Sequence, residues 1–343
     1  MGEQMEIENT NENGSSEIEL TETENELYDR QIRLWGLESQ KRLRTAKILI
    51  SGLGGIGAEV TKNIILSGVH AVKLNDANSV TEDDFCSQFL APRTSLGKNR
   101  AESSIERAKA LNPMVEISAD TQPISEKSED YFCGFDVVVI TGATNNELLR
   151  IDEICRRNDI KFFAGDVWGM FGYTFADLND HAFVEDVAKH KVISKPNEKV
   201  KTELVTTTVQ RELKFAPYQA VVDFDINSPS YQKKLKRTGP AFLLLRVLQK
   251  FREEFGRDPS YKSRESDLQE LLRIRDILGS TDLLTTDYLE NTFSQISPAA
   301  AVVGGVLAQE IIKTVTKKEA PNCNLFLFDP QTCCGFIEAI GVN

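Results

Sequence analysis

The segment KILISGLGGIG, residues 47–57, decides the fold of this chain. Its apolar start predicts a strand, Gly52, Gly54 and Gly57 follow with G-x-G-x-x-G spacing, and the sequence can continue as a helix to residue 67. This order suits a nucleotide-phosphate cradle, because glycine lets backbone N–H groups approach phosphate oxygens at the positive end of a helix. Glycine spacing alone also fits a tight turn, so the surrounding sequence has to decide.

The next elements favour a nucleotide-binding fold. Residues 69–74 predict a second strand, and Asp76 follows it, 19 residues beyond Gly57. An acidic residue at that distance can accept hydrogen bonds from ribose hydroxyls. The order of strand, glycines, helix and acid therefore predicts a Rossmann-type start, and leaves open whether a mononucleotide or a dinucleotide fits.

Composition places the chain among ordinary globular proteins. With 343 residues and 41% hydrophobic content, it can form one large core or two smaller ones. Residues 1–26 contain nine Glu and no Lys or Arg, so they carry most of the net charge of −12. We expect this acidic leader to be disordered. It lacks the features of a secretory signal, and no uninterrupted apolar run reaches the roughly 18 residues of a membrane span, so we expect an intracellular, soluble protein without membrane or nucleic-acid partners.

The cysteine pattern predicts free thiols. None of the cysteines forms a C-x-x-C pair, and the chain has only three histidines, so we expect no zinc site. The six cysteines are Cys86, Cys133, Cys155, Cys323, Cys333 and Cys334.

The rest of the chain predicts an α/β fold with a doubly wound, mostly parallel sheet. Residues 136–141 form an unbroken β-branched run, typical of a strand covered on both faces, and a ligand crevice is expected beyond it at residues 142–146. Strands and helices alternate on both sides of this run. The sequence predicts a Rossmann-type domain over 27–182 and 294–343, interrupted by a helical insertion with a Lys-rich loop over 183–293.

Several phrases together resemble the adenylation domain of ubiquitin-like-protein activating enzymes, whose bacterial relatives adenylate sulfur-carrier proteins. In that family the C-terminal carboxylate of a ubiquitin-like protein attacks the α-phosphate of MgATP. A cysteine then captures the acyl adenylate as a thioester. The phrases are YDRQIRLWG at 28–36, the glycine loop at 52–57, SQF at 87–89, GKNRAE at 97–102, GDVWG at 165–169, GYTF at 172–175 and AVVGGVLAQE at 301–310.

The chain departs from the active members of that family. This chain has Ser87 at a position where the active members carry Arg, and Arg100 at a position where they carry Lys. Residues 142–146 contain no carboxylate that could bind magnesium. No cysteine lies between Cys155 and Cys323, so the insertion cannot supply the thioester nucleophile. We therefore expect neither a metal site nor a thioester cysteine in this chain. The resemblance implies a vestigial nucleotide site at Gly52, Gly54, Gly57, Asp76, Gln88, Lys98 and Arg100.

The resemblance also assigns a role to Arg30. The corresponding arginine of the family reaches across a pseudo-twofold interface to the phosphates of ATP bound in a larger partner, which carries ATP, magnesium, zinc and the catalytic cysteine. On periodicity alone, Arg30 could equally be a surface cation paired with Asp29 or Glu26, and Arg33 is a weaker candidate for the same role. A ubiquitin-like protein, its conjugating enzyme and a nuclear as well as cytoplasmic location are further implications of the family.

Three other functions stay open on the residues alone. One is a self-sufficient homodimeric adenylyltransferase, which the missing magnesium carboxylate disfavours. Another is a nicotinamide-dependent oxidoreductase, for which the glycine loop and Asp76 would suffice. The third is a scaffold that only binds its partner.

Overall fold

An eight-stranded mixed sheet organises the chain, and the computed structural model describes residues 20–192, 202–229, 231, 233, 235, 239–280 and 283–342. Strands β3, β2, β1, β4 and β5 run parallel, whereas β6, β9 and β10 continue the sheet with antiparallel pairing. The predicted, mostly parallel α/β sheet is thus confirmed. In spatial order the strands are β10 (Gly335–Glu338), β9 (Leu325–Phe328), β6 (Phe171–Asp177), β5 (Lys161–Trp168), β4 (Val137–Thr141), β1 (Lys47–Ser51), β2 (Ala71–Asn75) and β3 (Glu116–Asp120).

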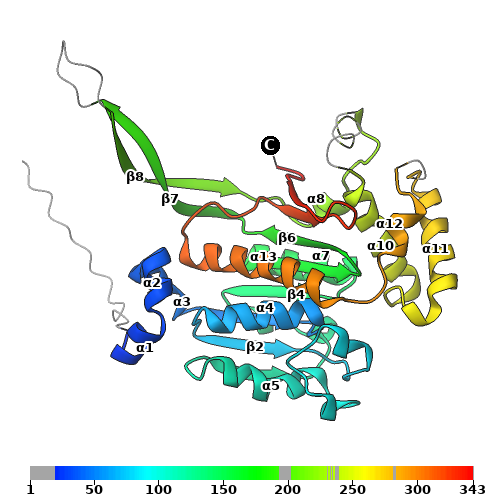
Figure 1. The fold of residues 1–343 in the computed structure, drawn as a ribbon, viewed down its shortest axis with the longest axis horizontal. Helices are drawn as coiled ribbons and strands as arrows, with labels where there is room; N and C mark the ends of the chain where they lie inside the picture. The colour runs from blue at the N-terminus through cyan, green and yellow to red at the C-terminus, as the bar shows by residue number, and fades with distance from the viewer. Residues whose placement is uncertain are drawn as a thin grey trace, which may run out of the picture.

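Helices cover both faces of the sheet, as expected for a doubly wound fold. Val137 and Val139 of β4 belong to the core on one face, and Val138 and Ile140 to the core on the other, so the unbroken apolar run is buried on both sides. Figure 1 shows α4 and α13 side by side over the sheet. The first core contains α4 (Gly55–Leu66), α5 (Arg100–Leu111) and α13 (Ser297–Thr316), and the second contains α7 (Asn145–Arg157), α8 (Gln219–Val222) and α10 (Ala241–Phe255).

The insertion differs from the predicted helical subdomain in its first part. Strands β7 (Asp180–Val192) and β8 (Thr202–Lys214) pair as an antiparallel ribbon that extends away from the sheet (Figure 1). The β-branched run at 205–209 explains this, because such residues favour extended backbone. The predicted Lys-rich loop is therefore wrong for Lys189 and Lys191, which lie in β7. Lys195, Lys199 and Lys201 lie outside the described residues.

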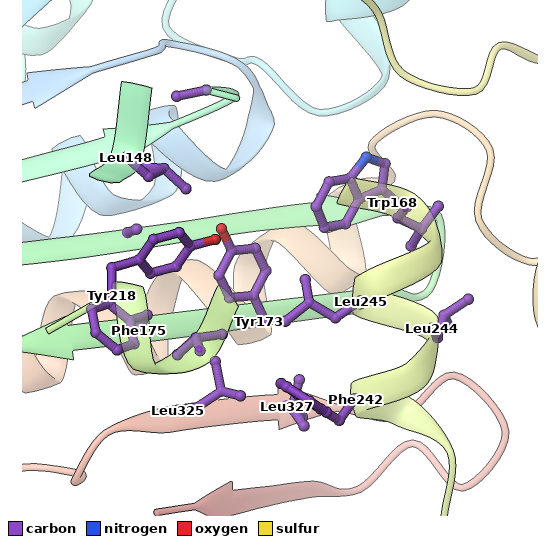
Figure 2. Close-up of a cluster of buried hydrophobic side chains, with 14 of the residues drawn as sticks. Leu148, Trp168, Tyr173, Phe175, Tyr218, Phe242, Leu244, Leu245, Leu325 and Leu327 are labelled. Atoms are coloured by element: carbon purple, nitrogen blue, oxygen red, sulfur yellow. The ribbon is translucent and has the colours of Figure 1, made fainter. Parts of the chain in front are cut away.

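The second part of the insertion is helical, but it shares its core with the sheet. Figure 2 shows Phe242 and Leu245 of α10 lying against Tyr173 and Leu327 of the strands. The insertion is thus a cover for one sheet face. The remaining helices after β8 are η4 (Tyr261–Ser263), α11 (Arg264–Ile277) and α12 (Thr286–Glu290), and the shorter ones before β5 are η1 (Asp83–Cys86), η2 (Arg93–Ser95), η3 (Ile124–Glu126) and α6 (Glu129–Phe132).

The amino-terminal helices correct the predicted boundary of the acidic leader. Residues 20–26 belong to the folded part, because Thr21 and Glu24 form a reciprocal capping box at the start of a helix and Glu24 pairs with Arg44 at 2.8 Å. Although burial acts to raise it, the hydrogen bonds from Thr21 and the charge of Arg44 hold the pKa of Glu24 below its ordinary value. Residues 1–19 lie outside the described part. The helices here are α1 (Glu22–Leu27), α2 (Asp29–Trp35) and α3 (Leu37–Leu43).

Helix α13 is, by length and composition alone, apolar enough to span a membrane. Its inner face, however, packs against α4 and strands β5 and β6. This is the environment of a core helix in a doubly wound fold, so its composition follows from burial on one face.

The capping box yields a stability prediction. Thr21→Ala removes the side chain that accepts from the Glu24 N–H at 3.2 Å, so the free energy of unfolding should fall by about 1 kcal/mol. Thr23→Ala is the matched control, because Thr23 is exposed inside the same helix and alanine is the better helix former. Urea unfolding of both variants measures the difference. Equal stability of the two variants would place the start of the fold after this helix.

Candidate functional site

A cavity of about 430 Å³ lies at the carboxyl ends of β1 and β4, where the sequence predicts a ligand crevice. The glycine loop forms one wall, Thr141 and Gly142 form the floor, and residues 257–260 of the insertion close the opposite side. In an open parallel sheet this is the usual place for a ligand. The question is whether the groups that line it are free to hold one.

Two of the three motif glycines are required by backbone packing. Gly52 has φ +87°, and a Cβ on it would lie 2.1 Å from the carbonyl oxygen of Thr141. A Cβ on Gly57 would lie 2.0 Å from the carbonyl oxygen of Gly52. Both contacts are far inside van der Waals distance, so any side chain at these positions would separate β1 from β4 or from α4. The spacing is therefore explained without a bound phosphate.

The loop also bonds to a side chain that no sequence motif indicated. The Gly55 N–H donates to Gln295 Oε1 at 2.7 Å, and a Cβ on Gly54 would lie 2.8 Å from the same oxygen. Gln295 precedes α13 and is 240 residues away from the loop in sequence, so no local pattern could reveal it. A donor that a phosphate oxygen would need already has a partner within the chain.

Asp76 is likewise saturated by its neighbours. Its Oδ1 accepts from the backbone and side-chain nitrogens of Asn78 at 2.9 and 3.0 Å, and its Oδ2 accepts from the Leu53 N–H at 2.7 Å and Arg100 Nη1 at 3.0 Å. Four donors occupy the lone-pair directions of a carboxylate. Asp76 thus ties the glycine loop to the next strand and has no acceptor left for a ribose hydroxyl.

Of the other predicted polar site residues, Arg100 and Gln88 bond to groups within the chain, and Lys98 lies outside the cavity. Arg100 lines the cavity, but its guanidinium is held by Asp76 and by Asp84, with Nε 3.2 Å from Oδ1. Gln88 is buried, donates to Ser104 Oγ at 3.0 Å and accepts from the Ala91 N–H at 2.9 Å. Lys98 is exposed and does not line the cavity. Of the polar residues predicted here, the structure brings Asp76 and Arg100 together and leaves Gln88 and Lys98 apart.

The cavity does not fit magnesium and a triphosphate. Its acidic side chains are Asp83, Asp84 and Asp258, and each one already pairs with a cation of the chain. Within the described residues no three metal-ligating side chains come together. A triphosphate needs uncompensated positive charge and an oxygen-rich metal site, and this crevice offers neither.

A buried ion network closes the crevice and was missed by the sequence analysis. Arg252 of α10 donates Nη1 to Asp166 Oδ2 and to the Ala143 carbonyl at 2.7 and 2.8 Å, and it pairs with Asp258 through Nε at 2.8 Å. Trp168 Nε1 donates to Asp258 at 2.8 Å, and the guanidinium lies over the Trp168 ring. Although burial acts to lower it, the two carboxylates raise the pKa of Arg252 well above its ordinary value. The network fixes the insertion against the end of β4.

The two candidate arginines of α2 behave differently. Arg33 is engaged by Asp29, with Nε–Oδ1 and Nη2–Oδ2 distances of 3.1 Å. Arg30 is exposed, and in the part of the chain that the structure describes no hydrogen bond or ion pair holds its guanidinium. The alternative reading of Arg30 as a cation paired with Asp29 or Glu26 therefore does not match the geometry.

Arg30 also lies far from the crevice of its own chain. Its neighbour Gln31 donates Nε2 to the Leu66 carbonyl at 2.9 Å, which places α2 at the carboxyl end of α4. The glycine loop is at the other end of that helix, whose 12 residues span about 18 Å. The guanidinium of Arg30 is therefore remote from this cavity.

The six cysteines are free thiols. Cys155 is buried, and burial raises its pKa above the ordinary value. Cys323 is half-buried, and its pKa is raised for the same reason. The remaining four are exposed on the surface.

Comparison with known proteins agrees with the resemblance found in the sequence. The model of the ThiF family matches residues 28–333. The chain is 45% identical over 340 residues to SUMO-activating enzyme subunit 1 of Xenopus tropicalis, covering 95% of this chain and 98% of the relative. The protein of the same name from Homo sapiens is 44% identical over 334 residues, covering 94% and 96%. A crystal structure of E. coli MccB with succinimide shares the fold, with a TM-score of 0.55 at 13% identity over 92% of this chain and 72% of that one.

Close packing at the loop leads to a prediction about its glycines. Gly52→Ala should lower the free energy of unfolding by several kcal/mol, because the added Cβ collides with the Thr141 carbonyl. Gly142→Ala is the matched control. Its φ is also positive, at +70°, but nothing lies within 4 Å of its Cβ position, so it should cost only about 1 kcal/mol. Urea unfolding of the two variants, without nucleotide, measures the difference, and similar losses would count against a packing role.

Proposed function

The chain belongs to the ThiF family, and from that premise we propose that it is the smaller, non-thioester-forming subunit of a heterodimeric SUMO-activating enzyme. It would support ATP-dependent adenylation of the SUMO C-terminus and transfer of SUMO to a cysteine of the larger subunit. Near full-length similarity to SUMO-activating enzyme subunit 1 carries this proposal. The occupied Gly55 N–H and the four donors on Asp76 in this chain's own crevice support it.

Within this proposal, Arg30 acts in trans at the ATP site of the larger subunit. Its free guanidinium can bind two phosphate oxygens at once. Charge that forms on the phosphates during adenylation would be stabilised by such a group. The Asp29–Arg33 pair supports the choice, because it removes Arg33 and the nearest carboxylate from competition.

The partners and location follow from the same family. ATP and magnesium would be bound mainly in the larger subunit, which would also hold any zinc. SUMO and, through the complex, the SUMO-conjugating enzyme would be further partners. We propose a nuclear location, with a cytoplasmic fraction, on the basis of the relatives.

The other functions left open by the sequence have weaker support. A homodimeric adenylyltransferase would need this chain's own cradle, where Gly55 and Asp76 are already bonded within the chain. A nicotinamide-dependent oxidoreductase would use the same two groups. A pure scaffold would not need the free guanidinium of Arg30, so a kinetic test of Arg30 separates it from the favoured function.

The role of Arg30 can be tested in the assembled heterodimer. Arg30→Ala should slow ATP–pyrophosphate exchange with SUMO by about 100-fold or more, since a phosphate-binding arginine is removed. Arg33→Ala is the matched control on the same helix and should change the rate only a few-fold. Size-exclusion chromatography should show normal assembly of both, because both side chains are exposed. Wild-type exchange by the Arg30→Ala complex would remove this residue from the mechanism.

A second test concerns the crevice itself. The isolated chain with MgATP and SUMO should show no pyrophosphate exchange above background, because its loop donor and acidic acceptor are occupied. The heterodimer at the same concentration is the positive control. Exchange by the isolated chain would instead support the self-sufficient adenylyltransferase.

A further inference from the structure

A second cavity, of about 570 Å³, lies at the edge of the sheet opposite the crevice. We call it the amino-end cavity, because it is formed where β4 and β5 begin and where α3 and α13 end. The start of β4 contributes residues 136 and 137, and the start of β5 contributes Lys161. Arg42 comes from the end of α3, Lys317 from the end of α13, and His181 of β7 completes the wall. Nothing in the proposed function uses this edge of the molecule.

His181 is the unusual member of this cavity. The residue is 2% exposed, and its Nε2 has no hydrogen-bond partner among the described residues. One ring face stacks on Phe183, with the ring centroids 6.4 Å apart. A buried ring nitrogen without a partner carries a desolvation cost, which native proteins usually offset with a hydrogen-bonding group from the protein or from an ordered water. The cavity beside His181 gives such a group a place.

Charges around the cavity favour an anion. Three cations line it, Arg42, Lys161 and Lys317, against two carboxylates, Asp136 and Asp159. This is a local excess of positive charge in a chain with a net charge of −12. Besides these five charged residues and His181, the exposed thiol of Cys133 also lines the cavity.

Both carboxylates already have partners within the chain. Asp136 Oδ2 accepts from the Lys47 N–H at 2.8 Å, and Asp159 Oδ1 lies 2.7 Å from Lys161 Nζ. Lys161 is thereby engaged as well, and it also donates to the Leu178 carbonyl at 3.1 Å.

Two cations keep unused donors. Arg42 donates Nη1 to the Thr316 carbonyl at 2.6 Å, and its other guanidinium nitrogens have no partner among the described residues. Lys317 has no side-chain partner there either. Among the described residues, the cavity groups with unused hydrogen-bonding capacity are therefore the Lys317 ammonium, part of the Arg42 guanidinium and His181 Nε2.

We propose that the amino-end cavity binds a small molecule bearing an oxyanion, a phosphate or a carboxylate, held by Arg42, Lys317 and His181 Nε2. Arg42 and Lys317 supply positive charge, and the imidazole supplies a hydrogen bond from the buried wall. The site is separate from the crevice, because it lies at the other ends of the parallel strands.

The histidine provides its own spectroscopic probe. Burial, with Lys161 and Lys317 adding to it, lowers the pKa of His181 to about 4, so the ring is neutral at pH 7. An anion bound beside it would favour the protonated ring and raise this pKa. The chain contains only three histidines, so the imidazole signals of the full chain can be resolved by NMR after selective labelling.

The experiment is an NMR titration of the full chain at constant ionic strength with inorganic phosphate, and separately with succinate. Binding should shift the His181 signals in a saturable manner and raise the pKa of His181, while sodium chloride should do neither. Saturation by phosphate alone or by succinate alone would identify the preferred oxyanion.

Two matched lysine variants test whether the anion binds in the amino-end cavity. Lys317→Asn should weaken binding about tenfold, because one charged hydrogen-bond donor is lost, and Asn tolerates the left-handed backbone there, with φ 53°. Lys318→Asn removes the same charge next to it, where the lysine faces Asp186 at 3.9 Å, and should leave binding unchanged. Unmoved His181 signals with both anions, or equal effects of the two variants, would overturn the proposal.

Discussion

The contact on which the rest of the structure depends is the close approach of backbone at the glycine loop. The Gly52 carbonyl accepts from Thr141 Oγ1 at 2.7 Å and touches the position where Gly57 lacks a side chain. This contact joins β1, β4 and the start of α4. The crevice exists because three elements meet there with no side chain between them. Once glycine is required for packing, the motif persists whether or not a phosphate is ever bound.

Loss of a ligand at such a crevice leaves polar backbone that needs other partners. Gln295 accepts from the loop, Asp76 collects four donors, and Arg252 bridges two carboxylates and the carbonyl after β4. A buried polar group without a partner would be costly, so each of these bonds contributes to keeping the crevice folded. The same bonds take the place of the interactions that a nucleotide would make.

The sequence predicted the parts of the fold that depend on local pattern. The strand of residues 136–141, the helix that follows the glycine loop and the doubly wound order rest on residue pattern, and they match the structure. The ribbon of β7 and β8 was missed because its lysines suggested a solvated loop, although a paired strand can also expose them. The partners Gln295 and Arg252 were missed because they contact the crevice across 240 and 86 residues, respectively. Only tertiary folding decides such contacts.

Helix α2 carries an exposed arginine, Arg30, away from the crevice of its own chain. Its Asp29 is satisfied by Arg33 one turn away, which leaves Arg30 between them without a local partner. Asn112 holds the preceding Tyr28 through Nδ2–Oη at 2.9 Å, so the helix has a fixed base. An exposed guanidinium on a fixed helix loses less entropy on binding than one on a mobile loop. Because α4 separates Arg30 from the crevice of its own chain, the proposed role in trans requires a second molecule docked at this end.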